Sequence, residues 1–365
     1  MGIVNLFSPN WHPADSYGRI AHELSNHLES SGYYVNKFGD DAPKHNVRLC
    51  FGGIFLGYPT DHAGHISQYR LAEMGARLSI TMFESTKVPD GWTESLNACD
   101  RVIAPADFLV NVFKQSGVGT PIEVVPLGIS EAFTKAAKRR VIPEDDKPLT
   151  FVCVADRGNR KNWQKVMFAF VRAFGNDERF KLVVKSRSLL ARFSNRNIQV
   201  IAEDYSDEQM AELYANAHVM VFPSSGEGFG LPPREFAATG GVALTTNWGG
   251  TADDLYQYGI PVPHTMTDAW NDKPEWYGKL GQWADIDIDT LADQMRYIAD
   301  HYESYIDFGI RAGGFVRSHY RWDVFAKRVQ SIWEGLVKES SHVNNGHRET
   351  VAPAQDKRLL DLIPG

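Results

Sequence analysis

A glycine-rich loop between a predicted strand and a predicted helix constrains the fold of this chain more than any other feature. Residues 219–222 are apolar and predict a buried strand, and helix formers begin at Arg234, after two prolines that suit a first helical turn. Between them, Gly226, Gly228 and Gly230 let the backbone come close to a ligand. Such a loop offers unpaired N–H groups and the positive end of a helix dipole, so the segment predicts an anion site.

Two carboxylates, Glu227 and Glu235, frame this loop. A Glu-x7-Glu pair around Gly-Phe-Gly-Leu-Pro resembles the signature of the retaining GT-B glycosyltransferases of family four, also called glycosyl transferases group 1. The resemblance implies that Glu227 binds the donor sugar and that Glu235 binds the ribose of the nucleotide. The residues between them match the family's donor loop: Gly228, Phe229, Gly230 and Leu231. The alternative is a solvated Glu227 and a Glu235 favoured only by the helix dipole.

Both halves of the chain alternate strands with helices, which predicts doubly wound, mostly parallel sheets. In the first half, strands are expected at 1–8, 34–38, 47–51, 78–82, 101–104 and 123–125, and helices at 18–28 and 107–116. In the second half, strands are expected at 149–154, 180–185, 198–202, 219–222 and 242–245, and helices at 163–174, 207–215, 235–239, 251–258, 291–302 and 323–338. Thr251 and Asp254 form a capping signature, and capping also explains Asp287 before the helix at 291.

A chain of 365 residues, 43% of them hydrophobic, is long enough for two domains with separate cores. The resemblance implies the GT-B fold, in which two Rossmann-like domains face a cleft. The predicted parts are an acceptor-side domain (1–134), a linker (135–148), a nucleotide-sugar-binding domain (149–322), a helix crossing back to the first domain (323–339) and a flexible tail (340–365). Residues 138–140 are a basic cluster that we interpret as solvated linker, with a membrane or nucleic-acid contact as the alternative.

A basic loop follows the strand at 149–154 and opens a helix. A diphosphate leaving group needs facing cations, and the loop looks like the family's Arg…Lys pair, which assigns Arg157 and Lys161 to the pyrophosphate. The gap between them is shorter than the family's, so Arg160 competes with Arg157 for this role. Lys185, at the end of a neighbouring strand, is a further candidate cation at the same edge. By the same resemblance, Tyr205 either stacks on the nucleobase or is a surface aromatic residue.

The first domain offers fewer markers. Gly18 resembles the family's glycine that approaches the donor phosphates, although an ordinary helix start explains it equally well. The family commonly places a histidine near the donor sugar, but residues 81–86 contain none, which leaves Glu84 as the candidate polar group. His62 and His65 could replace it from a neighbouring loop. They lack further ligands at a recognisable spacing, so no metal site is expected.

The composition of the chain argues against a membrane span and against general attraction to polyanions. No apolar run approaches the roughly 20 residues needed to span a bilayer, and residues 1–7 predict a strand without the basic start of a signal peptide. The net charge is −7, and residues 1–134 contain 9 lysines and arginines against 14 aspartates and glutamates, so a polyanion would need a local basic patch. Three widely separated cysteines suggest reduced thiols and a cytoplasmic location.

The resemblance therefore implies a retaining, metal-independent hexosyltransferase that uses a UDP- or GDP-linked sugar and no cofactor. The expected partners are this donor and a hydroxyl acceptor of unknown class, most simply in glycan or polysaccharide assembly. An alternative acceptor is a hydroxylated base of viral DNA, the only role expected for a nucleic acid. Two alternatives of another class are a GT-B-fold nucleotide-sugar epimerase and a non-catalytic nucleotide-sugar-binding protein.

Overall fold

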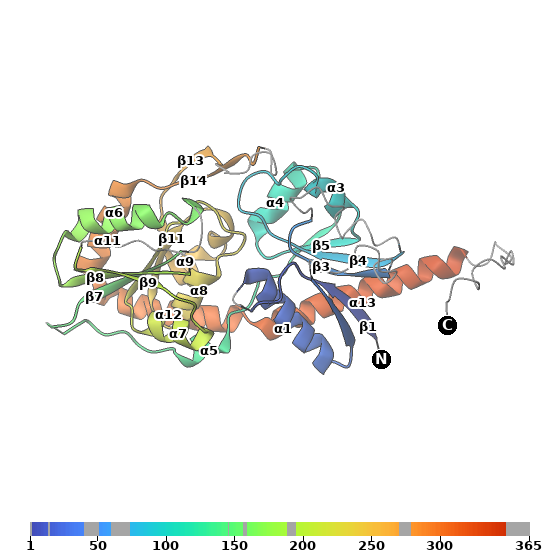
Figure 1. The fold of residues 1–365 in the computed structure, drawn as a ribbon, viewed down its shortest axis with the longest axis horizontal. Coiled ribbons are helices and arrows are strands. Elements are labelled where there is room, and N and C mark those ends of the chain that lie inside the picture. Colours follow the sequence, from blue (N-terminus) through green and yellow to red (C-terminus); the bar gives the residue numbers. More distant parts are fainter. Residues whose placement is uncertain are drawn as a thin grey trace.

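The computed structural model describes residues 2–13, 15–39, 51–59, 74–144, 146–155, 159–187, 195–269 and 279–347. Two parallel six-stranded sheets form the centres of two domains, which lie side by side along the longest axis of the molecule (Figure 1). The predicted fold of two doubly wound α/β domains is confirmed.

The first domain is built on a sheet of order β2-β1-β3-β4-β5-β6. Its strands are β1 (Ile3–Phe7), β2 (Tyr34–Phe38), β3 (Phe51–Leu56), β4 (Met74–Ile80), β5 (Arg101–Ala104) and β6 (Ile122–Val124), and its helices include α1 (Ser16–Ser30), α3 (Trp92–Asn97) and α4 (Asp107–Gln115). In α1, Ile20, Leu24 and Leu28 recur at helical spacing and are fully buried. The strand order reverses between β1 and β3, which opens a crevice beyond their carboxyl ends.

The second domain is built on a sheet of order β12-β11-β10-β7-β8-β9. Its strands are β7 (Leu149–Val154), β8 (Phe180–Ser186), β9 (Ile198–Ala202), β10 (Val219–Phe222), β11 (Val242–Thr246) and β12 (Gly259–Val262), and its helices include α6 (Trp163–Phe174), α7 (Asp207–Ala215), α8 (Leu231–Ala238), α11 (Ile288–Asp300) and α12 (Tyr302–His319). All four residues of β10 are buried and apolar, as in parallel strands covered on both faces. Here the order reverses between β7 and β10, so the loops after these strands meet at the crevice.

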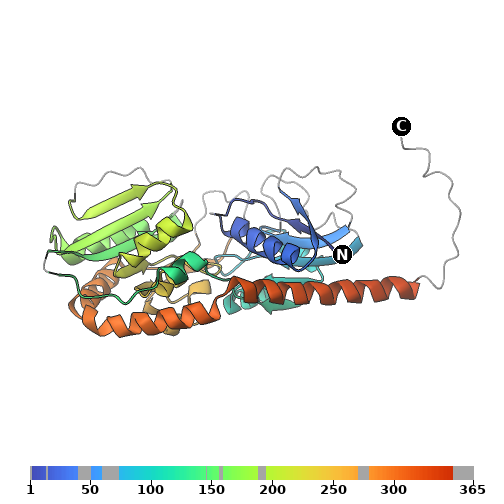
Figure 2. The ribbon, with the colours of Figure 1, turned by 90° about the horizontal axis from the view of Figure 1, so that it is seen from below.

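The last helices connect the two domains. α12 lies along the second domain, and the next helix, α13 (Trp322–His347), lies along the first (Figure 2). Between them, Ile129 and Arg321 form a parallel bridge. α13 lies against α1 and β4, and two hydrogen bonds, His27 Nε2 to Gln330 Oε1 (2.8 Å) and Tyr33 Oη to Glu334 Oε1 (2.7 Å), tie it to the first domain. Residues 340–347 of the predicted tail are helical, and the remainder of that tail lies outside the described residues.

Of the strand predicted at 47–51, only Phe51 lies within the described residues; β3 runs from there to Leu56 and includes two glycines. Those glycines permit close strand packing: a Cβ on Gly52 would lie 2.0 Å from the carbonyl oxygen of Ala76 in β4, and one on Gly53 would lie 2.5 Å from that of Asn5 in β1. The pair looks like a strand terminator in the sequence but here lets three strands approach one another.

The predicted helix at 251–258 is confirmed only over its last turn, and its capping signature is wrong. The chain forms a short 3-10 turn, η3 (Gly249–Thr251), and one helical turn, α9 (Leu255–Tyr258). The Thr251 hydroxyl donates to the carbonyls of Thr246 and Trp248, and Asp254 accepts from the Tyr320 hydroxyl, so neither side chain caps a helix. The capping role of Asp287 is confirmed, since its carboxylate accepts from the backbone N–H of Thr290 at 2.8 Å.

Our interpretation of residues 138–140 as a solvated cluster is wrong for Arg140. Its guanidinium is buried against the second domain and donates to three carbonyl oxygens there, those of Tyr214, Ala217 and Thr239. Arg139 pairs at the surface with Asp307. A buried arginine whose donors are satisfied holds the backbone around it in one position. Residues 138–140 of the linker are therefore anchored to the second domain.

Candidate functional site

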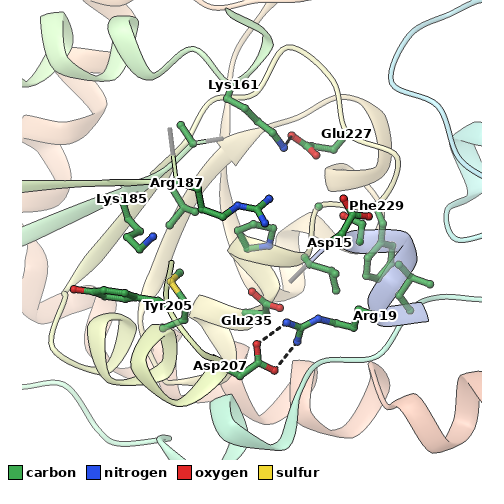
Figure 3. Close-up of a pocket in the computed structure, with 18 of the residues that line it drawn as sticks. Asp15, Arg19, Lys161, Lys185, Arg187, Tyr205, Asp207, Glu227, Phe229 and Glu235 are labelled. Carbon is green, nitrogen blue, oxygen red and sulfur yellow. Dashed lines mark hydrogen bonds and ion pairs between the residues drawn. The ribbon is translucent and has the colours of Figure 1, made fainter. Parts of the chain in front are cut away.

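A cavity of about 930 Å³ lies between the two domains, at the carboxyl ends of both sheets (Figure 3). Its volume is within the range of small-molecule sites. The first domain lines it with loop and helix residues that include His12, Asp15, Tyr17, Arg19, Tyr58, Met82 and Glu84. The second domain lines it from the loops after β7, β8, β9 and β10, including Arg160, Lys161, Lys185, Arg187, Tyr205, Asp207, residues 227–232 and Glu235.

The glycine loop after β10 forms one wall of this cavity. Gly230 has a φ of +83°, and a Cβ there would lie 2.4 Å from Thr251 Cγ2. A Cβ on Gly228 would lie 2.6 Å from the Met82 side chain of the opposite domain, so only glycine allows the two domains to come this close.

The same loop presents unpaired donors. Within the described part of the chain, the backbone N–H groups of Gly228, Phe229 and Gly230 have no acceptor. Because α8 begins at Leu231, the positive end of its dipole faces the same space. The wall therefore has the features of an anion site, as predicted.

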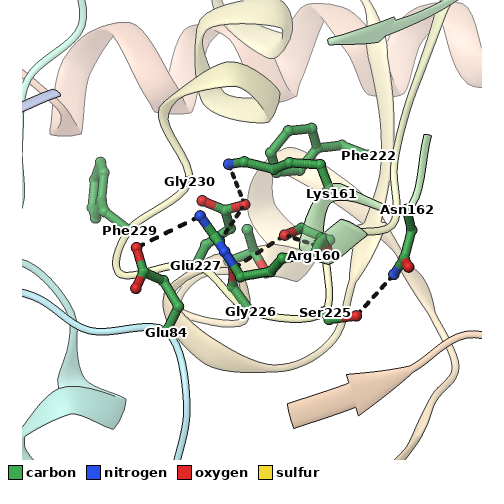
Figure 4. Close-up of polar contacts among 12 residues, drawn as sticks. Glu84, Arg160, Lys161, Asn162, Phe222, Ser225, Gly226, Glu227, Phe229 and Gly230 are labelled. Carbon is green, nitrogen blue, oxygen red and sulfur yellow. Dashed lines mark hydrogen bonds and ion pairs between the residues drawn. The ribbon is translucent and has the colours of Figure 1, made fainter. Parts of the chain in front are cut away.

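Glu227 is the centre of a charged cluster (Figure 4). Its Oε1 lies 2.6 Å from Lys161 Nζ and 3.2 Å from an Arg160 guanidinium nitrogen. Arg160 also donates to the carbonyl oxygen of Gly226 and reaches across the cleft to Glu84, 3.6 Å away. Lys161 Nζ lies 5.2 Å from the centre of the Phe222 ring. Two cations and two carboxylates from both domains thus meet at one end of the cavity.

Burial and charge oppose each other in this cluster. Burial raises the pKa of Glu227, but the adjacent Lys161 and Arg160 outweigh it, and the net shift is downward. Burial lowers the pKa of Lys161 more than Glu227 raises it. The Glu227 carboxylate is therefore held ionised, and the cationic form of Lys161 depends on an anion next to it.

Glu235 lies deeper, toward the other end of the cavity. It is buried, and no hydrogen bond links its carboxylate to any other described residue. Burial raises its pKa to about 7, opposed by the positive charge of Arg19 and assisted by the negative charge of Asp207. A buried carboxylate that faces a cavity without a partner is suited to accept hydrogen bonds from a ligand.

A lysine and an aromatic ring form the wall opposite Glu235. Lys185 Nζ lies 4.7 Å from the centre of the Tyr205 ring and donates to the carbonyl oxygen of Glu203. Arg187 lies on the same side, 3.9 Å from the Asp204 carboxylate. Lys185 and Tyr205 both line the cavity, and their predicted roles toward the diphosphate and the nucleobase stay predictions.

The predicted residues thus divide into three groups. Lys161, Arg160, Glu227, Glu235, Glu84, Lys185, Tyr205 and the loop from Gly228 to Leu231 line one cavity. Gly18 is buried against the backbone of His12, where a Cβ would lie 2.1 Å from the carbonyl oxygen, so packing within the chain explains this glycine. Arg157, His62 and His65 lie outside the described residues, and their roles stay predictions.

Three residues of the site carry no signal that the sequence analysis used. Arg19 and Asp207 form an ion pair across the cleft, beside Glu235. Arg234 lies behind the glycine loop, fully buried, with its guanidinium 4.1 Å from the centre of the Phe229 ring. It donates to four carbonyl oxygens, those of Phe229, Gly230, Gly250 and Asp253, and so connects the loop to the segment after β11. No sequence signal marks Arg234, because its acceptors are backbone carbonyls.

Neither a metal centre nor a membrane span is found in the part of the chain that the structure describes. Its histidines, cysteines, aspartates and glutamates form no group of three or more that could hold a metal ion. Its helices are all too short or too polar to cross a bilayer.

Comparison with known proteins gives a family match over part of the chain and several solved structures of similar fold. Residues 134–259 match the sequence model of the family described as "Glycosyl transferases group 1". No curated protein sequence matches the chain. Among solved structures, sucrose-phosphate synthase from Thermosynechococcus elongatus is 14% identical and aligns over 92% of this chain and 99% of its own, with a TM-score of 0.66. The α,α-trehalose 6-phosphate synthase from Burkholderia multivorans is 12% identical over 93% of this chain and 100% of its own, with a TM-score of 0.64.

HepE from Anabaena, solved in complex with UDP and glucose, is 10% identical over 92% of this chain and 100% of its own, with a TM-score of 0.61. At these identities the likeness concerns the fold, which is GT-B. The family match over residues 134–259 contains both Glu227 and Glu235, and it confirms the resemblance to group 1 glycosyltransferases that their spacing predicts.

Proposed function

We propose that this chain is a retaining glycosyltransferase that moves a hexose from a UDP- or GDP-linked sugar to a hydroxyl acceptor, without a metal ion or cofactor. One observation carries the proposal: Glu227, Lys161 and Glu235 line the same cavity as the unpaired N–H groups of the glycine loop. A nucleotide-sugar needs these groups together, namely acceptors for its sugar and ribose hydroxyls and a cationic, N–H-rich wall for its diphosphate.

The proposed roles follow from position. The diphosphate lies between the glycine loop and the cations Lys161 and Arg160, the ribose hydroxyls donate to Glu235, and the sugar hydroxyls donate to Glu227. Lys185 and Tyr205 then border the nucleobase. Arg157 remains a second candidate for the diphosphate beside Arg160. The solved complex of HepE with UDP and glucose supports a ligand of this class in this fold.

In the proposed reaction, the bond between the anomeric carbon and the diphosphate oxygen breaks while the acceptor oxygen attacks the same face of the sugar. The acceptor's proton passes to the departing phosphate oxygen, so no separate base is required. The chain supplies electrostatic stabilisation: Lys161, Arg160 and the end of α8 face the negative charge that develops on the leaving group. Glu227 holds the sugar as positive charge grows at its anomeric carbon.

For the acceptor, we propose a carbohydrate hydroxyl in glycan or polysaccharide assembly. Asp15 and Glu84 line the first domain's side of the cavity, and Arg19 on that side is already paired with Asp207. This acidic wall disfavours a DNA backbone, which would require neutralising cations. Cys99 and Cys153 are buried and free, which suits the proposed cytoplasmic location.

Incubation of the protein with a panel of UDP- and GDP-linked hexoses tests the proposal before any acceptor is known. We expect one donor to raise the thermal midpoint and to be slowly hydrolysed, with release of the nucleoside diphosphate. An isomerised nucleotide-sugar without release of nucleoside diphosphate would identify an epimerase instead. Binding without turnover, also in the presence of a carbohydrate acceptor panel, would identify a binding protein.

A further inference from the structure

An ion pair crosses the cleft at the end of the cavity where Glu235 lies (Figure 3). Arg19 belongs to α1 of the first domain and Asp207 to α7 of the second, 188 residues apart in the chain. Two parallel hydrogen bonds join them, at 2.7 and 2.5 Å, in the fork geometry that makes arginine–carboxylate pairs strong and directional. Both side chains are largely shielded from solvent, with exposed fractions of 16% and 29%.

Both partners are held in place by their own domains. Arg19 Nε donates to the carbonyl oxygen of Pro13 at 3.2 Å, and the Asp15 side chain caps the first turn of α1. Asp207 is the first residue of α7, and Ser206 and Gln209 form a capping box there. Since Arg19 is already oriented and the backbone that carries Asp207 is fixed, less entropy is lost when the pair forms than in an ordinary surface ion pair.

The pair lies against the carboxylate proposed to bind the ribose. The positive charge of Arg19 lowers the pKa of Glu235, against the burial that raises it to about 7. The titratable groups that face Glu235 among the described residues are Arg19 from α1 and Asp207 and Tyr214 from α7, and Tyr214 is held neutral by its burial. When the domains separate, Arg19 leaves with the first domain, and the ionised form of Glu235 loses its nearest cation.

We propose that Arg19 and Asp207 form a clasp that holds the two domains closed over the nucleoside half of the donor and governs the release of the nucleoside diphosphate. This inference rests on the proposed function for the identity of the ligand. Closure brings Arg19 to the carboxylate that must accept the ribose hydroxyls, so forming the clasp and binding the nucleoside favour each other. Arg19 and Asp207 are positioning residues, since they act through the domain arrangement and through Glu235.

The test compares the wild type with Asp207→Asn, Arg19→Lys and Arg19→Gln. Glu131→Gln is the control, because it removes one charge from the exposed Glu131–Lys135 pair. We expect Asp207→Asn to speed dissociation of UDP or GDP, whichever the wild type binds, by about tenfold. Arg19→Lys should give a smaller increase, because it keeps the charge and loses the fork. In Arg19→Gln, the pH midpoint of nucleotide affinity should move upward relative to that of the wild type, which loss of a merely structural contact would not cause.

Small-angle X-ray scattering of the same proteins, with and without nucleotide, measures closure directly. We expect a larger radius of gyration for Asp207→Asn than for the wild type and for Glu131→Gln. Dissociation rates and scattering of Asp207→Asn equal to those of Glu131→Gln would overturn the clasp while leaving the proposed function intact. If the wild type binds neither UDP nor GDP, the proposed function fails, and ligand-free scattering still decides whether the clasp exists.

Discussion

Replacing Glu235 with glutamine should make the protein more stable above neutral pH and weaken its nucleotide binding at the same time. In the folded protein, burial raises the pKa of this carboxyl from 4.5 to about 7, with Arg19 only partly compensating. The folded state therefore holds a proton between these two pH values that the unfolded state has lost. The stability that this protonation difference contributes is complete below pH 4.5, and it is lost as the pH rises through 7.

The size of this effect follows from the shift. A change from 4.5 to about 7 corresponds to roughly 3 kcal/mol of unfolding free energy between pH 4.5 and pH 8, at about 1.4 kcal/mol per unit. Glutamine does not titrate, so Glu235→Gln should lack this loss. The difference in unfolding free energy between variant and wild type should therefore grow by up to about 3 kcal/mol across that range. Any fixed effect of the amide on packing is the same at every pH and does not alter the growth.

Urea unfolding at pH 5, 6, 7 and 8, followed by tryptophan fluorescence, measures the difference, with Glu131→Gln as the exposed control. Calorimetric titration at pH 8 should show the opposite sign for binding. Losing a charge-assisted hydrogen bond from the ribose costs roughly 1.5–3 kcal/mol, or about 10- to 150-fold in affinity for the bare nucleoside diphosphate. A stability difference that stays constant from pH 5 to pH 8 would refute the reasoning about burial, and unchanged nucleotide affinity would remove the ribose assignment.

Three further predictions concern the other end of the cavity and its support. Glu227→Gln should lower the turnover number at least tenfold, about 1.4 kcal/mol, with nearly unchanged affinity for free nucleoside diphosphate; the converse pattern in steady-state kinetics and calorimetry would mean that the two glutamates exchange roles. Turnover should persist in excess chelator, and a complete loss restored by added metal would contradict the metal-independent proposal. Arg234→Leu should lower the unfolding free energy by more than about 3 kcal/mol, because three buried carbonyls and one partly buried carbonyl lose their donor; a urea midpoint equal to that of the wild type would contradict this.

The fold was predictable where the strands are continuous apolar runs. β7 and β10 have the predicted bounds, because strands covered on both faces leave little ambiguity in the pattern. β9 also has the predicted bounds, although it is a partly exposed edge strand. The hairpin of β13 (Thr265–Asp268) and β14 (Gln282–Asp285) was missed, since β13 is exposed along its length and shows no apolar run. The continuation of β3 to Leu56 was missed because its two glycines suit close packing between strands, which depends on neighbours far away in the chain.

The site was predictable only where its residues are neighbours in sequence. Glu227, Glu235 and the loop between them form a local pattern, and Lys161 follows a recognisable strand. Arg19 and Asp207 could not be paired from the sequence, because their contact joins two domains and leaves no spacing rule. Arg234 carries a charge in a segment that otherwise becomes buried, and its acceptors are backbone carbonyls, which leave no trace in residue type.

In the proposed reaction, the cluster around Glu227 exchanges partners when the donor binds. Lys161 and Arg160 are balanced there by Glu227 and Glu84, so the cations are already paired. A diphosphate with two negative charges, placed against the glycine loop, competes with Glu227 for Lys161. Burial lowers the pKa of Lys161, which makes a stronger anion the preferred partner of its cationic form. Once the diphosphate takes Lys161, the Glu227 carboxylate is free to accept from the sugar hydroxyls. Diphosphate binding would thus free Glu227 to bind the sugar. One cluster can therefore contact both the sugar and the diphosphate, the two groups that the breaking bond joins.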